Sequence, residues 1–282
     1  RLAESTSVVR QFTEDSDRRL APTRSRSGTA LILAAGNLSS LPKLPGVYEE
    51  ADAVAAAQRT HTNLTVKVLH DKEVAFDAAE LMIEAFGEYQ LLHIASHGDY
   101  VEGDPARTGA LLSDDIVFTA GKVGLLPTVP ELVFLNCCNL ARVGLNRMAA
   151  GLARELMAIG VRAVVAAGWP VGDSAAVAFA ETFYDKFLAG IPFGESVASA
   201  RLACAAAAGG GETWAAYQCY GDPMLVFSGA TPTTQENHSD PASEDDLLRR
   251  LIALDVRASD LGRPGETALE ARRAALVGTL HG

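Results

Sequence analysis

Two short segments of this sequence place a reactive side chain at the end of an apolar run that is typical of a buried β-strand. Residues 91–98 read LLHIASHG and end in His97-Gly98, and residues 132–139 read LVFLNCCN and contain Cys138. In open α/β sheets, functional groups collect at the carboxyl ends of the strands. A cysteine nucleophile needs a base or an ion-pair partner, because the thiolate is the reactive form. The two segments therefore predict a thiol and an imidazole that face each other at one edge of a sheet.

Two other interpretations of His97 and Cys138 compete with a catalytic pair. A buried cysteine most often behaves as a small apolar residue. Zinc is the second alternative, since His93 and His97 share one face of a strand and Cys138 would supply a third ligand, although the sequence has no CxxC or HExxH motif. His93 is more simply a packed, hydrogen-bonded strand residue, and we expect no metal and no cofactor.

The chain around these two positions alternates between apolar runs and amphipathic stretches. Residues 29–35 (TALILAA) form a continuous apolar run, as in strands that are buried on both faces. The sequence predicts further strands at 64–69, 90–95, 131–136, 161–167, 214–220 and 225–227, a hairpin at 110–118, and helices at 47–60, 71–88, 148–159, 173–188 and 194–208. Strands that alternate with helices imply an α/β fold with a mainly parallel sheet and helices on both faces.

This pattern divides the 282 residues into three parts. Residues 1–27 are a polar arm or linker without an apolar period, and residues 229–282 begin as a Thr/Pro/Ser-rich linker and continue as a helical extension. The domain that carries the predicted site spans residues 28–228. Because the sequence begins with Arg1, we expect it to be a piece of a longer protein.

Composition excludes several classes of partner. The formal net charge of −11 argues against direct binding of nucleic acid, which needs clustered Lys and Arg. We expect no membrane contact, since no apolar run approaches the roughly 20 residues of a membrane span and no signal peptide is visible. The four cysteines, two of them adjacent at Cys137 and Cys138, do not resemble a disulfide framework. These features predict a cytoplasmic protein.

At these residues the chain resembles the CHAT family, caspase-like cysteine peptidases of clan CD that are related to caspases and separase. The resemblance covers about residues 28–228 and rests on six landmarks in order: 41–51 (LPKLPGVYEEA), 93–98 (HIASHG), 111–114 (LLSD), 132–141 (LVFLNCCNLA), 151–173 (GLARELMAIGVRAVVAAGWPVGD) and 220–223 (YGDP). Two departures stand out: Asn136-Cys137 replaces the family's Ser-Ala, and residues 139–141 replace its usual tail after the nucleophile.

The resemblance implies a caspase-like fold and an endopeptidase with a His–Cys dyad. Cys138 takes the place of the nucleophile and His97 that of the acid–base group, while the N–H groups of Gly98 and Cys138 take the place of the oxyanion hole. Asp173, at the end of the WPVGD stretch, resembles the acidic residue of an S1 pocket that reads a basic side chain. Asp173 also stands where a helix N-cap belongs. Successive strand residues point to opposite faces, so Cys137 and Cys138 cannot both face His97.

For partners, the resemblance implies a protein substrate and regulation by sensor or repeat domains, in a bacterial effector that acts in the cytoplasm. Two alternatives belong to other classes. One is a catalytically inactive CHAT scaffold that serves as an interaction module. The other is a flavodoxin-like ligand-binding domain, which lacks support because no glycine-rich phosphate loop follows Ala35.

Overall fold

The computed structural model describes residues 9–10, 23–24, 28–71, 89–99, 109–114, 116–119, 128–138, 145–207 and 212–227. At residues 23–24, 128, 138 and 145–150 it describes the backbone alone. The helix predicted at 71–88 lies outside the described residues from position 72 onward, and so does the extension at 229–282.

One sheet runs through the described domain. Its main strands lie in the order β10-β9-β8-β4-β2-β3. They are β2 (Thr29–Ala35), β3 (Thr65–His70), β4 (Leu91–Asp99), β8 (Leu132–Cys138), β9 (Ala163–Ala167) and β10 (Tyr217–Gly221). Neighbouring strands are parallel except β10, which is antiparallel to β9. The short hairpin of β5 (Gly109–Leu111) and β6 (Val117–Thr119) extends the end of β4. The predicted α/β class with a mainly parallel sheet is confirmed.

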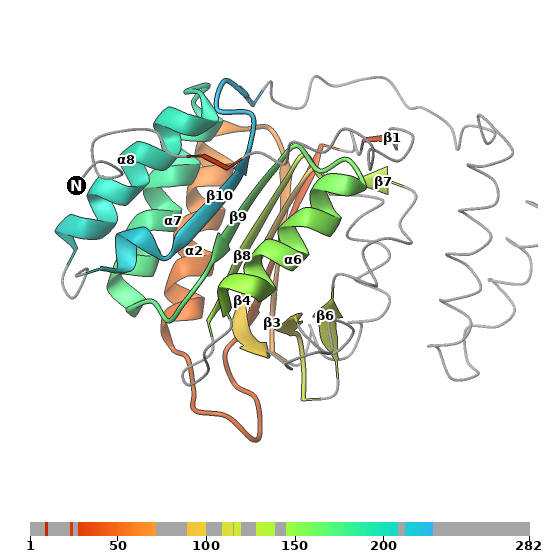
Figure 1. The fold of residues 1–282 in the computed structure, drawn as a ribbon, viewed down its shortest axis with the longest axis vertical. Helices are drawn as coiled ribbons and strands as arrows, with labels where there is room; N and C mark the ends of the chain where they lie inside the picture. The colour runs from red at the N-terminus through yellow and green to blue at the C-terminus, as the bar shows by residue number, and fades with distance from the viewer. Residues whose placement is uncertain are drawn as a thin grey trace, which may run out of the picture.

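Helices cover both faces of this sheet, as the sequence predicts (Figure 1). The helices α2 (Gly46–His61), α7 (Asp173–Leu188) and α8 (Phe193–Ala206) lie on one face, and α6 (Leu145–Ala158) lies on the other. Alternate strand residues supply two separate cores: Phe134 packs toward α2 and α7, whereas Val133 and Leu135 pack toward α6. Because both faces are buried, the strands read as continuous apolar runs rather than as alternating patterns.

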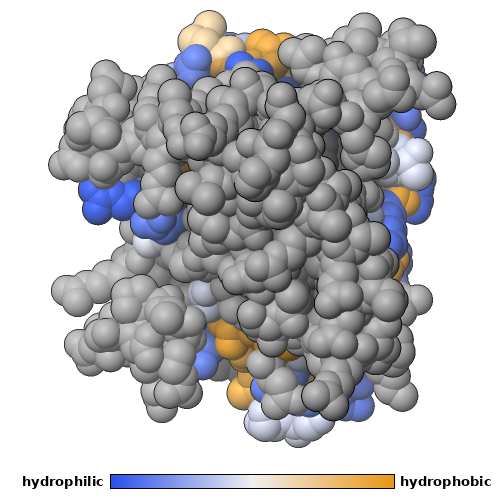
Figure 2. All heavy atoms as spheres, turned by 90° about the vertical axis from the view of Figure 1, so that its right-hand side faces the viewer, coloured by the Kyte–Doolittle hydropathy of each residue, from blue (hydrophilic) through white to orange (hydrophobic). Residues whose placement is uncertain are grey.

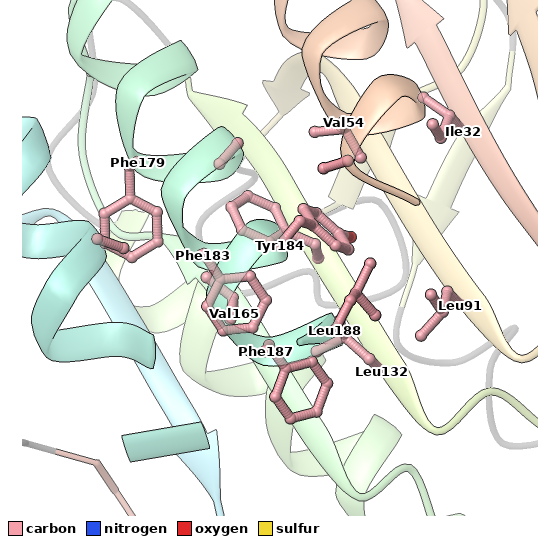
Figure 3. Close-up of a cluster of buried hydrophobic side chains, with 14 of the residues drawn as sticks. Ile32, Val54, Leu91, Leu132, Val165, Phe179, Phe183, Tyr184, Phe187 and Leu188 are labelled. Atoms are coloured by element: carbon pink, nitrogen blue, oxygen red, sulfur yellow. The ribbon is translucent and has the colours of Figure 1, made fainter. Parts of the chain in front are cut away.

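Aromatic rings fix α7 on strand β8, the strand that ends in Cys138. The Phe134 ring lies with its centroid 5.7 Å from that of Tyr184 and 6.0 Å from that of Tyr217. Tyr217 in turn stacks on Phe179 at 3.7 Å. Figure 3 shows Phe179 and Tyr184 with other side chains of α7 directed at the sheet. Aromatic pairs of this kind add about 0.5–1.5 kcal/mol each beyond the area they bury, so β8 is a rigid base for a site at its end.

The prediction of a last strand at residues 225–227 is wrong. Residues 225–227 are not a strand, and the predicted strand at 214–220 is shorter in the structure, because residues 214–215 belong to a 3₁₀ helix (Thr213–Ala215) before β10. The chain after β10 turns back to the start of α8, where the Phe193 N–H donates to the Leu225 carbonyl and the Gly194 N–H donates to the Pro223 carbonyl. These carbonyls therefore cap the first N–H groups of α8. The β-propensity of the segment does not indicate that its partner is a helix rather than a strand.

Two pieces of the predicted arm contact the domain. Arg10 forms a parallel bridge with Tyr220 of β10: its N–H donates to the Cys219 carbonyl at 2.8 Å, and its carbonyl accepts the Gly221 N–H at 3.1 Å. The short strand β1 (Thr23–Arg24) pairs in parallel with β7 (Thr128–Val129). Residues 9–10 thus occupy the outer edge of the sheet.

Most large apolar side chains in the described part of the chain are in the two cores, and four are exposed: Leu41, Leu202, Met224 and Val226. On the face that Figure 2 shows, hydrophilic and hydrophobic side chains of described residues lie next to one another. None of the helices described here has both the length and the apolar character that crossing a membrane requires.

Candidate active site

The structure brings the two predicted catalytic positions together at one sheet edge. Strands β4 and β8 are parallel neighbours, and their register runs from Leu91 opposite Leu132 to His97 opposite Cys138. Adjacent strands lie about 4.8 Å apart, so His97 and Cys138 are backbone neighbours although 41 residues separate them in the sequence. Both lie at the carboxyl ends of their strands, where the sequence analysis placed them.

The other cysteine of the pair belongs to the opposite face of the sheet. Cys137 is buried in the core that α6 covers. Its Sγ lies 3.5 Å from the Ser96 hydroxyl and 3.8 Å from the Ile94 carbonyl. A thiol in this position has no access to His97, which leaves Cys138 as the cysteine in register with the imidazole.

A backbone carbonyl orients the His97 imidazole. His97 is only 3% exposed, and its Nε2 lies 2.8 Å from the carbonyl oxygen of Pro42. Because a carbonyl can only accept, Nε2 carries the hydrogen, and Nδ1 is the unprotonated nitrogen of the neutral ring. Burial lowers the pKa of His97 below its usual 6.5, while the bond to Pro42 acts in the opposite direction with the smaller effect. The neutral imidazole is therefore the form present at pH 7.

The predicted pocket residue Asp173 lies where two helices begin. It is the first residue of α7, and its side chain packs against Gly46, the first residue of α2: a Cβ added to Gly46 would lie 2.6 Å from the Asp173 Cγ. The N-cap alternative is wrong, because the cap position is Gly172 and no side chain caps this helix. Two helix N-termini favour a negative charge at this point, and the Asp173 carboxylate is exposed there.

A buried polar cluster lies in the core beneath the two candidate residues. Glu50 of α2 is 1% exposed, and its Oε1 lies 3.2 Å from His93 Nε2 without hydrogen-bond alignment. Its Oε2 accepts a hydrogen bond from Asn136 Nδ2 at 2.5 Å. Asn136 Oδ1 accepts the Tyr217 hydroxyl at 3.4 Å, and the Tyr184 hydroxyl lies 3.4 Å from His93 Nδ1. His93 is therefore a packed core residue, and Asn136 uses both ends of its side-chain amide.

The described residues include no group of three or more His, Cys, Asp or Glu side chains that could hold a metal ion. Cys204 and Cys219 are both buried, and burial raises the pKa of each thiol to about 11. These two thiols therefore stay protonated at neutral pH and act as core residues.

Sequence reasoning missed the residues that support His97. Pro42 contributes a backbone carbonyl, which any residue type has, so its role leaves no trace in the sequence. Asp71 was assigned to the start of a helix, but it forms a turn whose carboxylate binds the loop after β2. Asp114 belongs to the predicted hairpin and to the LLSD landmark, neither of which indicates that its carboxylate binds the same loop. Both contacts join residues far apart in the sequence.

The parallel sheet, its helices and the His–Cys edge define a caspase-like α/β domain with a peptidase-like fold. A model of the CHAT domain matches residues 2–222, and the chain belongs to this family. The matched range includes most of the segment that the sequence analysis set apart as an arm. A comparison with curated proteins gave no match.

Solved structures of the gingipains share the fold. The Arg-specific cysteine proteinase gingipain R matches with a TM-score of 0.51 and 14% identity over 82% of this chain and 52% of its own. The complex of the pro- and mature domains of gingipain R from Porphyromonas gingivalis gives 0.51 and 14% over 86% and 56%. The chain spans about half the length of these proteinases, and the likeness concerns the fold alone.

Proposed function

We propose that this chain is a caspase-like cysteine endopeptidase in which Cys138 is the nucleophile and His97 the acid–base group. The observation that carries the proposal is the strand register, which pairs His97 with Cys138 at the carboxyl edge of the sheet. The buried contact of His97 with Pro42 supports it, because it leaves Nδ1 as the nitrogen that can accept a proton.

In the proposed reaction, His97 takes the thiol proton of Cys138, and the thiolate attacks the scissile carbonyl to form a tetrahedral intermediate. The N–H groups of Gly98 and Cys138 stabilise its oxyanion, and donors of this kind contribute roughly 10²–10³ in rate. The intermediate collapses to a thioester as protonated His97 gives its proton to the leaving amine. His97 then takes a proton from water, and the hydroxide attacks the thioester. The acid is released as the Cys138 thiolate leaves, and protonated His97 returns its proton to that thiolate.

The dyad is tested by three substitutions. Cys138→Ala and His97→Ala should each abolish cleavage of a peptide library, because residues that act as one unit lose nearly all activity on single substitution. Cys137→Ala is the matched control and should stay active, since its side chain packs in the core on the other face. An inactive Cys137→Ala together with an active Cys138→Ala would contradict the assignment of the nucleophile.

Labelling separates the peptidase from the scaffold alternative. A peptidase should react at Cys138 with a thiol-reactive peptide electrophile, as mass spectrometry of tryptic fragments would show. An inactive scaffold should show no preference for Cys138 over Cys204 and Cys219, whose thiols burial keeps protonated. Equal labelling of the three would favour the interaction module.

We further propose that Asp173 reads a basic residue at the cleaved position of the substrate. Its exposed carboxylate lies at the N-termini of α2 and α7, and α2 directly follows the loop that contacts His97. A carboxylate binds the Arg guanidinium in a bidentate, directional way, and gingipain R, a neighbour in fold, is described as Arg-specific. Asp173→Ala should reduce turnover of Arg substrates, and Asp185→Ala at the other end of α7 should not. Kinetics unchanged by Asp173→Ala would refute the pocket.

The setting of this activity stays a prediction. We expect a regulated bacterial effector of the cytoplasm that cleaves a protein partner and is controlled by sensor or repeat domains. Identification of the proteins that are cut when the purified chain is added to a cell extract, with Cys138→Ala as the control, would test the class of substrate.

A further inference from the structure

We propose that Asp71 and Asp114 are positioning residues for His97, because they hold the loop of residues 36–45 whose Pro42 carbonyl orients the imidazole. The inference rests on the proposed function, since it gives both carboxylates a part in the reaction of His97 and Cys138. In this proposal both side chains act on His97 through the loop.

Asp71 holds the start of the loop. Its Oδ1 accepts the backbone N–H groups of Gly36 at 3.1 Å and Asn37 at 3.0 Å, and its Oδ2 accepts the Tyr48 hydroxyl at 2.7 Å. Asp71 itself has a left-handed backbone with φ of 36°, which side-chain-bearing residues rarely adopt. Its N–H donates to the Ala34 carbonyl. Burial, reinforced by Asp71, raises the pKa of Tyr48 to about 12, so the hydroxyl remains a donor to the carboxylate.

Asp114 holds the middle of the loop from the opposite side. Its Oδ1 accepts the Ser39 N–H at 2.8 Å and its Oδ2 accepts the Ser39 hydroxyl at 2.7 Å, and these bonds lower the pKa of Asp114. Asp114 lies between β5 and β6, and β5 pairs with β4 through Ala110 opposite Gly98. The hairpin that carries Asp114 is therefore paired, through β5, with Gly98, the residue after His97.

The contacts form a closed path. His97 bonds to Pro42, three residues beyond Ser39; Ser39 bonds to Asp114; and the hairpin of Asp114 returns to Gly98. Apolar contacts hold the two ends of the loop, where Leu38 is buried and Leu44 packs against the core. Residues 39–43 between them, which include Pro42, are all exposed. A segment with few buried contacts opens easily unless polar bonds hold it. The two carboxylates thus add polar anchors at Gly36, Asn37 and Ser39, which limit how far the exposed stretch with the Pro42 carbonyl can move.

The experiment measures His97 directly, by ¹⁵N NMR titration of its imidazole in the unmodified chain and in Asp114→Ala. Loss of the anchor should hydrate the ring and move the pKa of His97 up toward 6.5, because burial is the larger cause of its depression. Removal of a negative charge by itself would move the pKa down, so an upward shift reports movement of the loop. Asp185→Ala is the matched control: it removes an exposed carboxylate whose partner is His61, on another part of the surface.

Turnover supplies the second measurement. Asp114→Ala should lower kcat by roughly 10- to 100-fold with a smaller change in KM, since a displacement of about 1 Å can cost about 10²-fold. Asp71→Ala should act in the same direction, and Asp71→Asn should recover most of the loss because its amide oxygen still accepts the two loop N–H groups. Circular dichroism checks that each variant is folded.

A His97 titration in Asp114→Ala that matches Asp185→Ala would overturn the inference. So would an Asp71→Asn variant that is folded and no better than Asp71→Ala. The NMR measurement needs no turnover, so a chain without peptidase activity would refute the proposed function while the titration still decided whether the carboxylates position His97.

Discussion

Glu50→Ala removes the one carboxylate in the polar cluster beneath the site. In the folded chain Glu50 is buried, accepts the Asn136 amide and lies beside His93, which is itself fully buried. Removal leaves the His93 ring without its carboxyl neighbour and the Asn136 Nδ2 without its acceptor. Asp52→Ala, two residues later on the same helix, removes an exposed carboxylate and is the matched control.

The loss should be large. The Asn136 amide and the His93 ring are buried polar groups, and leaving such a group without its partner costs about 1–3 kcal/mol each. The sum is a substantial part of the roughly 5–15 kcal/mol that stabilises a domain. With a urea dependence near the upper end of about 1–3 kcal/mol per M, the unfolding midpoint should fall by about 1–2 M. Asp52→Ala should stay within about 0.5 kcal/mol of the unmodified chain, as for most surface changes.

The assay is urea unfolding followed by circular dichroism and by tryptophan fluorescence. His93→Phe, alone and in the Glu50→Ala background, completes a double-mutant cycle, and the aromatic neighbours Phe134 and Tyr184 suit the new ring. We expect the two substitutions to be non-additive by about 0.5–3 kcal/mol, because each residue is the other's partner. A loss below about 1 kcal/mol for Glu50→Ala, or strict additivity in the cycle, would refute a stabilising pair.

Three further outcomes follow from other contacts. Asn136→Ser should lower the free energy of unfolding by about 1–3 kcal/mol, because the buried amide bonds are lost; an unchanged urea midpoint would show that they contribute nothing. Gly46→Ala should cost about 1–3 kcal/mol by overpacking against Asp173 and should reduce Arg-substrate turnover, whereas Gly151→Ala, whose Cβ would meet nothing within 4 Å, should do neither. Residues 28–229 alone should unfold cooperatively in urea, and an insoluble or molten product would contradict the predicted boundary.

The sequence was sufficient for the main strands of the sheet and for the placement of His97 beside Cys138. Strands buried on both faces leave continuous apolar runs, and topology then brings strand ends to one edge, so His97 and Cys138 could be placed by residue type alone. The sequence did not predict the structure of residues 225–227. This apolar segment is not a strand, and its Leu225 carbonyl accepts the N–H at the start of α8. Local pattern cannot show which partner an extended segment will find.

The support of His97 could not be predicted for a different reason. The bond to Pro42 uses a main-chain carbonyl, and the bonds of Asp71 and Asp114 to the loop join positions 34 to 75 residues apart. Aspartate is common at the start of a helix, yet the Asp71 carboxylate accepts hydrogen bonds from the N–H groups of Gly36 and Asn37. Tertiary contacts, which local propensity does not encode, decided its conformation.

The bridge between Arg10 and β10 has a consequence for how this chain meets other copies of itself. An uncovered edge strand presents unpaired N–H and C=O groups to which a strand of another molecule can add. In this fold the Cys219 carbonyl and the Gly221 N–H are already used by Arg10. The segment at residues 9–10 thereby competes with any incoming strand for the same hydrogen bonds, and displacement or cleavage of that segment would turn a closed edge into a surface for pairing between molecules.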